Sequence, residues 1–286
     1  MSPKPRAITV LTHQYPQETS DAITRLIEYA TEAGVEVRVS EDEAKKHGLE
    51  PRDGLSVRAD PDGDTDLAVV LGGDGTILTA LRMFAGQKAP VFAINYGAIG
   101  FLSTIDHGGL EDGMRRALEG DYELLPMPAL SADVGGERRI GVNDISFHRR
   151  ANARVAELEY HVQREQLGHV RCDGLVVSTP VGSTGYNLAN GGPVLAWGVE
   201  GYVVSFIAPH TLTARALVVA PGDTLTVENT SHRDEVAVST DGRTVGELGP
   251  GDGLDVAFSD DEVLLAQIPG STFYHRFREK FGRLAN

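Results

Sequence analysis

The feature that most constrains the fold is a glycine-rich turn at residues 72–76 (Gly-Gly-Asp-Gly-Thr), which joins the apolar run 67–71 to a helical pattern over 77–84. A short, continuous apolar run before an amphipathic helix is typical of a buried strand in a parallel α/β sheet. Glycines reach positive φ and let backbone N–H groups approach a phosphate, and the helix start adds its positive dipole end. The sequence therefore predicts a phosphate-handling turn at the end of a parallel strand.

Asp74 lies in the middle of this turn. Its carboxylate repels phosphate, so this residue does not serve only to bind a phosphate group. In such a position a carboxylate holds Mg²⁺ or accepts a proton from an attacking hydroxyl. The alternative is an ordinary βα turn, in which the glycines serve tight geometry and the aspartate caps the helix. The five residues alone leave both interpretations open.

The first 125 residues alternate strand and helix patterns, which predicts a Rossmann-like α/β domain with a parallel sheet. Strands are expected at 7–12, 35–39, 67–71 and 91–95. The polar stretch 41–65 is expected to form a helix fragment and a surface connection. A second glycine motif, Gly97 and Gly100, follows the last of these strands. It indicates backbone held close to a ligand, or a tight loop that buries Phe101 and Leu102.

After Pro126 the pattern changes to short alternating runs separated by Gly, Pro and Asp turns, which predicts an all-β sandwich over 126–269. The last segment, from Phe273 to Leu284, returns to helical spacing. We expect this helix to pack back on the first domain, so that 270–286 joins 1–125. The predicted fold class is therefore α/β plus all-β.

Three polar groups interrupt the apolar runs of the β domain. In the stretch 178–193, the side chains of Thr184, Tyr186 and Asn187 suit hydrogen bonds to a base, a ribose and a phosphate, although a turn and helix cap would use the same residue types. Asn143-Asp144 is either a binding pair or a bulge. Asp241 and Arg243 lie in a turn, where a solvated hairpin pair is the alternative.

Composition limits the class of function. The net charge of −15 argues against nucleic acid as a partner, because backbone binding needs clustered cations. There is no apolar stretch long enough to span a bilayer and no signal-peptide core, so neither a membrane nor secretion is expected. The single cysteine, Cys172, excludes an internal disulfide and favours a cytoplasmic location. The nine histidines show no metal-ligand spacing, so we predict no metal site made by the protein alone.

Taken together, the motifs resemble the NAD kinase family, which phosphorylates the adenosine ribose 2′-hydroxyl of NAD to give NADP. Six motifs occur in the family's order: 72–76, 94–102, 143–144, 173–186, 209–212 and 241–242. The resemblance implies an α/β domain and a β-sandwich domain with NAD between them. It also implies ATP or polyphosphate as donor, a divalent cation, usually Mg²⁺, and a homodimer or homotetramer.

By the same resemblance, Asp74 is the proton acceptor for the ribose hydroxyl, and Asn143 and Asp144 hold the adenine and the ribose. The other positions that match NAD- or phosphate-contacting residues of the family are Gly72, Gly73, Gly75, Thr76, Arg154, Arg171, Asp173, Thr184, Gly185, Tyr186, Asn187, Ala189, Ala208 and Arg243. Val181 and Gly185 depart from the family's usual hydroxyl and alanine, and Arg243 adds a cation. A cation at Arg171 implies NAD rather than NADH as acceptor.

Two other functions use some of the same features. Diacylglycerol and sphingosine kinases share the glycine turn, but a lipid kinase needs a membrane-seeking surface, and the acidic chain has no basic amphipathic helix. A non-catalytic dinucleotide sensor is the second alternative. A pure binder has no need of a base beside the hydroxyl it holds, so the presence of Asp74 and Asp144 disfavours this function.

Overall fold

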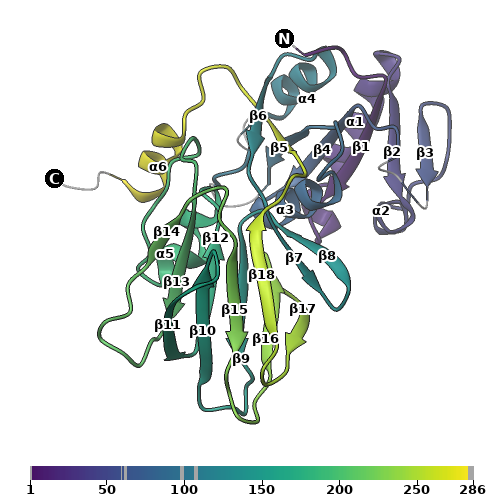
Figure 1. Ribbon diagram of the computed structural model, residues 1–286. Helices are drawn as coiled ribbons and strands as arrows, with labels where there is room; N and C mark the ends of the chain where they lie inside the picture. Colours follow the sequence, from purple (N-terminus) through teal and green to yellow (C-terminus); the bar gives the residue numbers. More distant parts are fainter. Residues whose placement is uncertain (1, 59, 61–62, 97–99, 106–108, 283–286) are drawn as a thin grey trace. The chain divides into compact units, whose positions relative to one another are not determined.

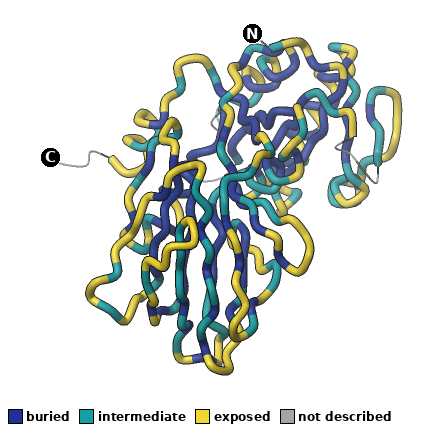
Figure 2. Tube along the Cα trace, viewed as in Figure 1, coloured by how far each residue is buried: buried dark blue, intermediate teal, exposed yellow. Residues whose placement is uncertain are grey.

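The computed structural model describes residues 2–58, 60, 63–96, 100–105 and 109–282. The chain forms two compact units, Met1–Pro126 with Glu262–Asn286, and Met127–Asp261. Each unit has its own hydrophobic core. Figure 1 shows the elements of both units, and Figure 2 shows that buried positions concentrate in the strands of each.

The first unit is a Rossmann-like sheet of seven strands in the order β3-β2-β1-β4-β5-β19-β6. Its strands are β1 (Ala7–Thr12), β2 (Glu36–Ser40), β3 (Leu55–Arg58), β4 (Leu67–Gly72), β5 (Val91–Asn95), β6 (Glu123–Met127) and β19 (Val263–Gln267). Its helices are α1 (Ser20–Glu32), α2 (Glu41–His47), α3 (Asp74–Met83), α4 (Leu110–Glu119) and α6 (Phe273–Phe281), with a 3-10 turn, η1 (Pro16–Glu18). β1 pairs in parallel with β2 and β4, and β5 with β4 and β19. Every residue of β4 and β5 is buried, which explains their continuous apolar runs.

Two expectations for this unit are wrong. The stretch 41–65 contains the strand β3 as well as α2, and β3 extends the sheet beside β2. Only Leu55 of β3 is fully buried, so this edge strand carries no clear apolar pattern. The run Val263–Gln267, expected in the β domain, is a strand of the first unit. All five of its residues are buried, as in a central parallel strand.

The second unit is a β-sandwich of two six-stranded antiparallel sheets, with orders β11-β10-β15-β18-β7-β8 and β14-β13-β12-β9-β16-β17. The first sheet contains β7 (Leu130–Val134), β8 (Glu137–Gly141), β10 (Ala156–Val162), β11 (Glu165–Cys172), β15 (Leu225–Asn229) and β18 (Gly253–Phe258). The second contains β9 (Asp144–Arg149), β12 (Gly174–Ser178), β13 (Tyr202–Ile207), β14 (Leu217–Val219), β16 (Val236–Thr240) and β17 (Arg243–Leu248). Alternate residues of both sheets, such as Ile145 and Phe147 of β9 and Leu158 of β10, form one core.

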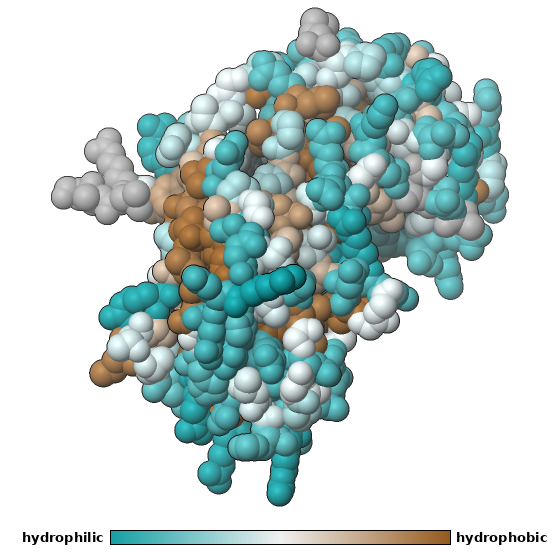
Figure 3. Space-filling view, in the orientation of Figure 1, coloured by the Kyte–Doolittle hydropathy of each residue, from teal (hydrophilic) through white to brown (hydrophobic). Residues whose placement is uncertain are grey.

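An apolar patch lies at one sheet edge of the second unit, on β14. Figure 3 shows apolar atoms gathered over β14, where Leu217 and Val218 are 37% and 47% exposed. Within the part of the chain that the structure describes, no helix has the length and apolar character needed to cross a membrane.

Candidate active site

The glycine turn lies at the carboxyl end of β4, where α3 begins at Asp74 with Gly73 at its N-cap. Gly73 has a φ of −94°, and neither Gly72 nor Gly75 is in the left-handed region. Close packing explains the first glycine instead: a Cβ on Gly72 would lie 2.7 Å from the Thr76 Oγ1 atom. The turn is therefore compact, with the N–H groups of the first turn of α3 at its surface.

The Asp74 carboxylate binds a neighbouring loop and does not cap its own helix. Its Oδ2 atom accepts a hydrogen bond from the Phe101 N–H at 3.1 Å, and its Oδ1 atom accepts one from the Leu102 N–H at 3.3 Å. The Lys280 Nζ atom of α6 lies 3.9 Å from Oδ2. A Cβ on Gly100 would lie 2.1 Å from Oδ1. The second glycine of the 94–102 motif thus makes room for this carboxylate, whereas Gly97 lies outside the described residues.

In the second unit, Asp241 organises the backbone around Asn143 and Asp144. Asp241 begins the β16–β17 turn with a φ of 45°, and Gly242 follows at 76°. Its carboxylate accepts three backbone N–H groups, from Val142 at 3.1 Å, Asn143 at 2.6 Å and Asp144 at 3.1 Å. The Asp241 N–H in turn donates to the Asp144 carbonyl at 3.0 Å. Asp241 therefore anchors a turn and is not a solvated hairpin residue.

Among the carboxyl groups around this turn of the second unit, Asp144 has the most strongly shifted pKa. It is 6% exposed at the start of β9. Burial, and secondarily the negative charge of Asp241, raise the pKa of the Asp144 carboxyl to about 7. Such a group exchanges a proton near neutral pH and suits a functional position.

The hydroxyl-rich stretch packs directly on the same backbone. Thr179 Oγ1 donates to the Val142 carbonyl at 2.7 Å and accepts from the Gly182 N–H at 3.0 Å. A Cβ on Gly182 would lie 2.0 Å from the Asn143 carbonyl oxygen, so only glycine fits there. The turn ends in η3 (Gly182–Thr184) and a single helical turn, α5 (Tyr186–Ala189). This packing brings Asn143 and Asp144 together with the predicted stretch 178–193.

A pair of aromatic rings lies beside these segments. The rings of Tyr186 and His148 are stacked, with centroids 5.7 Å apart and an interplanar angle of 12°. Tyr186 is 38% exposed, and burial followed by the charges of Asp144 and Asp173 raises the pKa of its phenol. Burial also lowers the pKa of His148, so its imidazole is neutral at neutral pH. The half-exposed rings offer a flat surface for a planar ligand.

His148, which lies beside Tyr186, is not among the residues predicted for the site. The available signal was the period-2 pattern of β9, in which Asp144, Ser146 and His148 share one face while Ile145 and Phe147 enter the core.

The other predicted contact residues lie in varied surroundings. Asp173 forms an ion pair with Arg149 at 2.7 Å, and Arg171 forms one with Glu157 at 3.2 Å. Thr184 Oγ1 donates to the Val181 carbonyl at 3.3 Å. Arg171 is exposed, as are Arg154, Gly185, Ala189, Arg243 and Ala208, which has a φ of 44°.

Asn187 differs from the expectation that it contacts a ligand through its side chain. The side chain is fully buried, and its amide nitrogen donates to the carbonyls of Ser183 at 3.0 Å and Pro193 at 2.9 Å. A Cβ on Gly192 would lie 1.8 Å from the Asn187 Oδ1 atom. Asn187 therefore holds the 183–193 turn closed.

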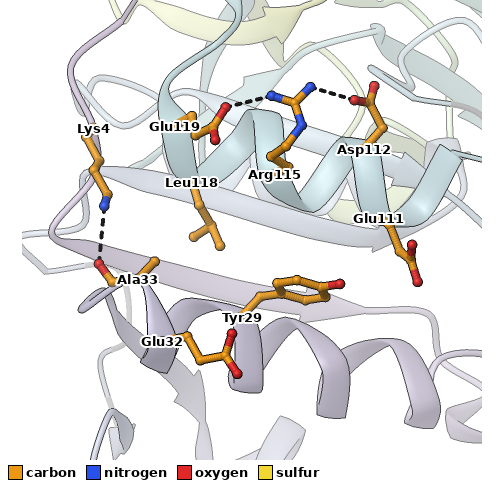
Figure 4. A pocket seen from close by; sticks show the side chains of 9 residues that line it. All are labelled: Lys4, Tyr29, Glu32, Ala33, Glu111, Asp112, Arg115, Leu118 and Glu119. Atoms are coloured by element: carbon orange, nitrogen blue, oxygen red, sulfur yellow. Dashed lines mark hydrogen bonds and ion pairs between the residues drawn. The ribbon is translucent and has the colours of Figure 1, made fainter.

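Two other features of the surface contain none of the predicted site residues. Within the described residues, Glu159, His161 and Glu228 offer metal-ligand atoms within 4.8 Å of one another. A cavity of about 640 Å³ lies between α1 and α4, and Figure 4 shows its lining. Acidic side chains outnumber basic ones there, and the glycine turn takes no part in it.

Comparison with known proteins identifies the family. The ATP-NAD kinase N-terminal domain matches residues 8–122, and the ATP-NAD kinase C-terminal domain matches residues 142–268. An NAD kinase of Gemmatimonas aurantiaca is 35% identical over 231 residues, which cover 79% of this chain and 80% of that protein.

Two solved structures share the fold at 24% sequence identity. Yeast NADH kinase complexed with NADH has a TM-score of 0.88 and covers 98% of this chain and 89% of its own. An NAD kinase from Archaeoglobus fulgidus in complex with ATP has a TM-score of 0.70 and covers 96% of each chain. Because the two domain matches span most of the chain and the bacterial relative aligns along most of its length, this chain belongs to the NAD kinase family.

Proposed function

We propose that Asp74 is the general base of the NAD kinase reaction catalysed by this chain. In that reaction the 2′-hydroxyl oxygen of the adenosine ribose bonds to the terminal phosphorus of the donor, and the bond from that phosphorus to the leaving phosphate oxygen breaks. The hydroxyl proton passes to the base. The observation that carries this assignment is the fixed but accessible carboxylate: both oxygens accept backbone N–H groups, and the side chain remains 33% exposed.

Asn143 and Asp144 are proposed to bind the adenine and the ribose. An ionised carboxylate accepts hydrogen bonds from two hydroxyl groups, which suits the 2′,3′-diol of a ribose. Asp241 and the Thr179–Gly182 turn hold the backbone of both residues, so the pair is rigid before the substrate binds. Because the pKa of Asp144 is about 7, we expect NAD to bind more tightly as the pH rises through neutrality.

The remaining contacts are divided between donor and acceptor. The turn formed by Gly72, Gly73, Gly75 and Thr76 is proposed to bind the donor phosphates through backbone N–H groups at the start of α3. The positions proposed to contact NAD are Arg154, Arg171, Asp173, Thr184, Gly185, Tyr186, Ala189, Ala208 and Arg243. The exposure of Tyr186 and its stacking on His148 support its place in this set.

The donor is proposed to be ATP, with polyphosphate as a second possibility, accompanied by Mg²⁺. The ATP complex of the archaeal relative supports the first choice. Mg²⁺ binds phosphate oxygens and keeps several waters, so the donor phosphates at the glycine turn would hold it with few protein ligands. When bound, it neutralises charge on the transferred phosphoryl group.

We also propose a cytoplasmic homo-oligomer, a dimer or tetramer. The single cysteine, Cys172, is buried and unpaired, as suits a reducing compartment. The exposed apolar side chains of Leu217 and Val218 at the β14 edge support self-association.

The direct test is NADP formation by the purified chain with NAD and Mg²⁺, comparing ATP, polyphosphate and no donor. Product with ATP or polyphosphate supports the proposal and identifies the donor. A folded protein that forms no NADP with either donor would contradict it.

A further inference from the structure

The C-terminal helix α6 reaches the carboxylate that the first unit holds at its glycine turn. We propose that Lys280, carried by α6, is a positioning residue for Asp74. This inference rests on the proposed role of Asp74 as the base and concerns how the chain holds that carboxylate in its reactive orientation.

The helix is attached through one face of aromatic rings. Phe273, Phe277 and Phe281 recur every four residues, so they lie on the same side of α6. Their ring centroids lie 6.2, 6.4 and 5.8 Å from that of Phe101. Phe101 is 4% exposed, and its backbone N–H is one of the two that bind Asp74. The loop that anchors the base is thus packed directly against α6.

Lys280 extends from the end of this aromatic face toward the same carboxylate. Its Nζ atom lies 4.8 Å from the centroid of the Phe101 ring and 3.9 Å from the Asp74 Oδ2 atom. The ring and the carboxylate together hold the ammonium group between them. Two backbone N–H groups and one cation therefore surround Asp74, and Gly100 leaves the space that the carboxylate occupies.

The other charged side chains of α6 have different partners. Arg276 donates to the Gln267 side chain at 2.9 Å and to the Ser271 hydroxyl at 3.2 Å. Arg278 contacts the His275 ring at 3.4 Å, and Glu279 lies 3.1 Å from the same ring. On α3, Arg82 donates to the Thr79 hydroxyl at 3.3 Å. Among the residues that the structure describes, Lys280 is the cation that the ion-pair geometry assigns to Asp74.

Such a contact affects turnover more than substrate affinity. Three groups hold the Asp74 carboxylate: the N–H groups of Phe101 and Leu102, and the Lys280 ammonium. Without the ammonium, the carboxylate spends part of its time in orientations that do not face the ribose hydroxyl, and misplacement of a reacting group lowers turnover strongly.

The test compares Lys280→Met and Lys280→Arg with the matched variant Arg278→Met. Arg278 is a cation of the same helix, but its side chain contacts His275 and not Asp74. For the full chain with Mg²⁺, NAD and the active donor, we expect Lys280→Met to lower kcat by about tenfold or more. Its KM for NAD should stay within about twofold, so that the loss falls on kcat alone. Lys280→Arg should recover most of kcat, and Arg278→Met should match the wild type.

Unchanged kcat in Lys280→Met would overturn the inference, as would an equal loss in Arg278→Met or a failure of arginine to rescue. Asp74→Asn, measured in parallel, separates the two levels of the argument. If Asp74→Asn turns over normally, the proposed base is wrong. If Asp74→Asn is inactive while Lys280→Met is fully active, only the role of Lys280 is wrong.

Discussion

Replacing Asp144 with asparagine is expected to stabilise the second unit above neutral pH. Folding leaves this carboxyl 6% exposed and raises its pKa from 3.8 to about 7. The folded unit therefore binds the proton more tightly than the unfolded chain, so the free energy of unfolding falls as the pH rises from about 4 to about 7. At about 1.36 kcal/mol per pKa unit, the penalty above pH 7 is at most about 4 kcal/mol. An uncharged asparagine of the same shape avoids it.

The single tryptophan, Trp197, lies in the same unit and makes this effect measurable. Urea unfolding followed by Trp197 fluorescence should show Asp144→Asn to be about 1–4 kcal/mol more stable than the wild type at pH 8 and less so at pH 5. The control is Asp234→Asn, which changes an exposed aspartate of the same unit and should show no such dependence.

A variant that is no more stable than the wild type at pH 8, or equally stabilised at both pH values, would refute the reasoning. The expected gain in stability accompanies a loss of NAD binding, because the asparagine lacks the charge proposed to accept the ribose hydroxyls. Stability given up at a functional site in this way is a general feature of enzymes.

Three further results are expected. Gly100→Ala should lower kcat by about tenfold or more, because the new Cβ would lie 2.1 Å from the Asp74 carboxylate. The control is Gly63→Ala, which places its Cβ in open space and should leave kcat unchanged in the same assay. Asp241→Asn should lower the free energy of unfolding of the second unit by about 1–3 kcal/mol in Trp197 melts and raise KM for NAD. The reason is that the amide nitrogen replaces one of the two carboxylate oxygens that accept the three backbone N–H groups. An unchanged KM would contradict the anchoring role of Asp241. Removing divalent cations with EDTA should abolish NADP formation without a change in circular dichroism, and excess Mg²⁺ should restore it.

The central strands could be predicted from the sequence because they are buried on both faces. The expected ranges 7–12 and 91–95 agree with β1 and β5, and the glycine turn does join β4 to α3. The edge strand β3 was missed because edge strands need little apolar surface. The run 263–267 was assigned to the wrong unit because pairing with β5 is a long-range contact that no local pattern encodes.

The site was predicted unevenly for a similar reason. The 143–144 and 178–193 stretches were each singled out by their polar residues, but their direct contact, through Gly182 and the Asn143 carbonyl, follows from the packing of the second unit. The burial of Asn187 was not foreseen, because a polar side chain that closes a turn and one that contacts a ligand look alike in sequence. Lys280 lies far from Asp74 along the chain, and only the packing of α6 brings the two together.

The measurement that tests the central claim most directly is the turnover of Asp74→Asn, with NAD affinity measured on the same preparation. If Asp74 is the base, NADP formation should fall by about 100-fold or more while NAD binds with an unchanged dissociation constant. Wild-type turnover in this variant would contradict the account.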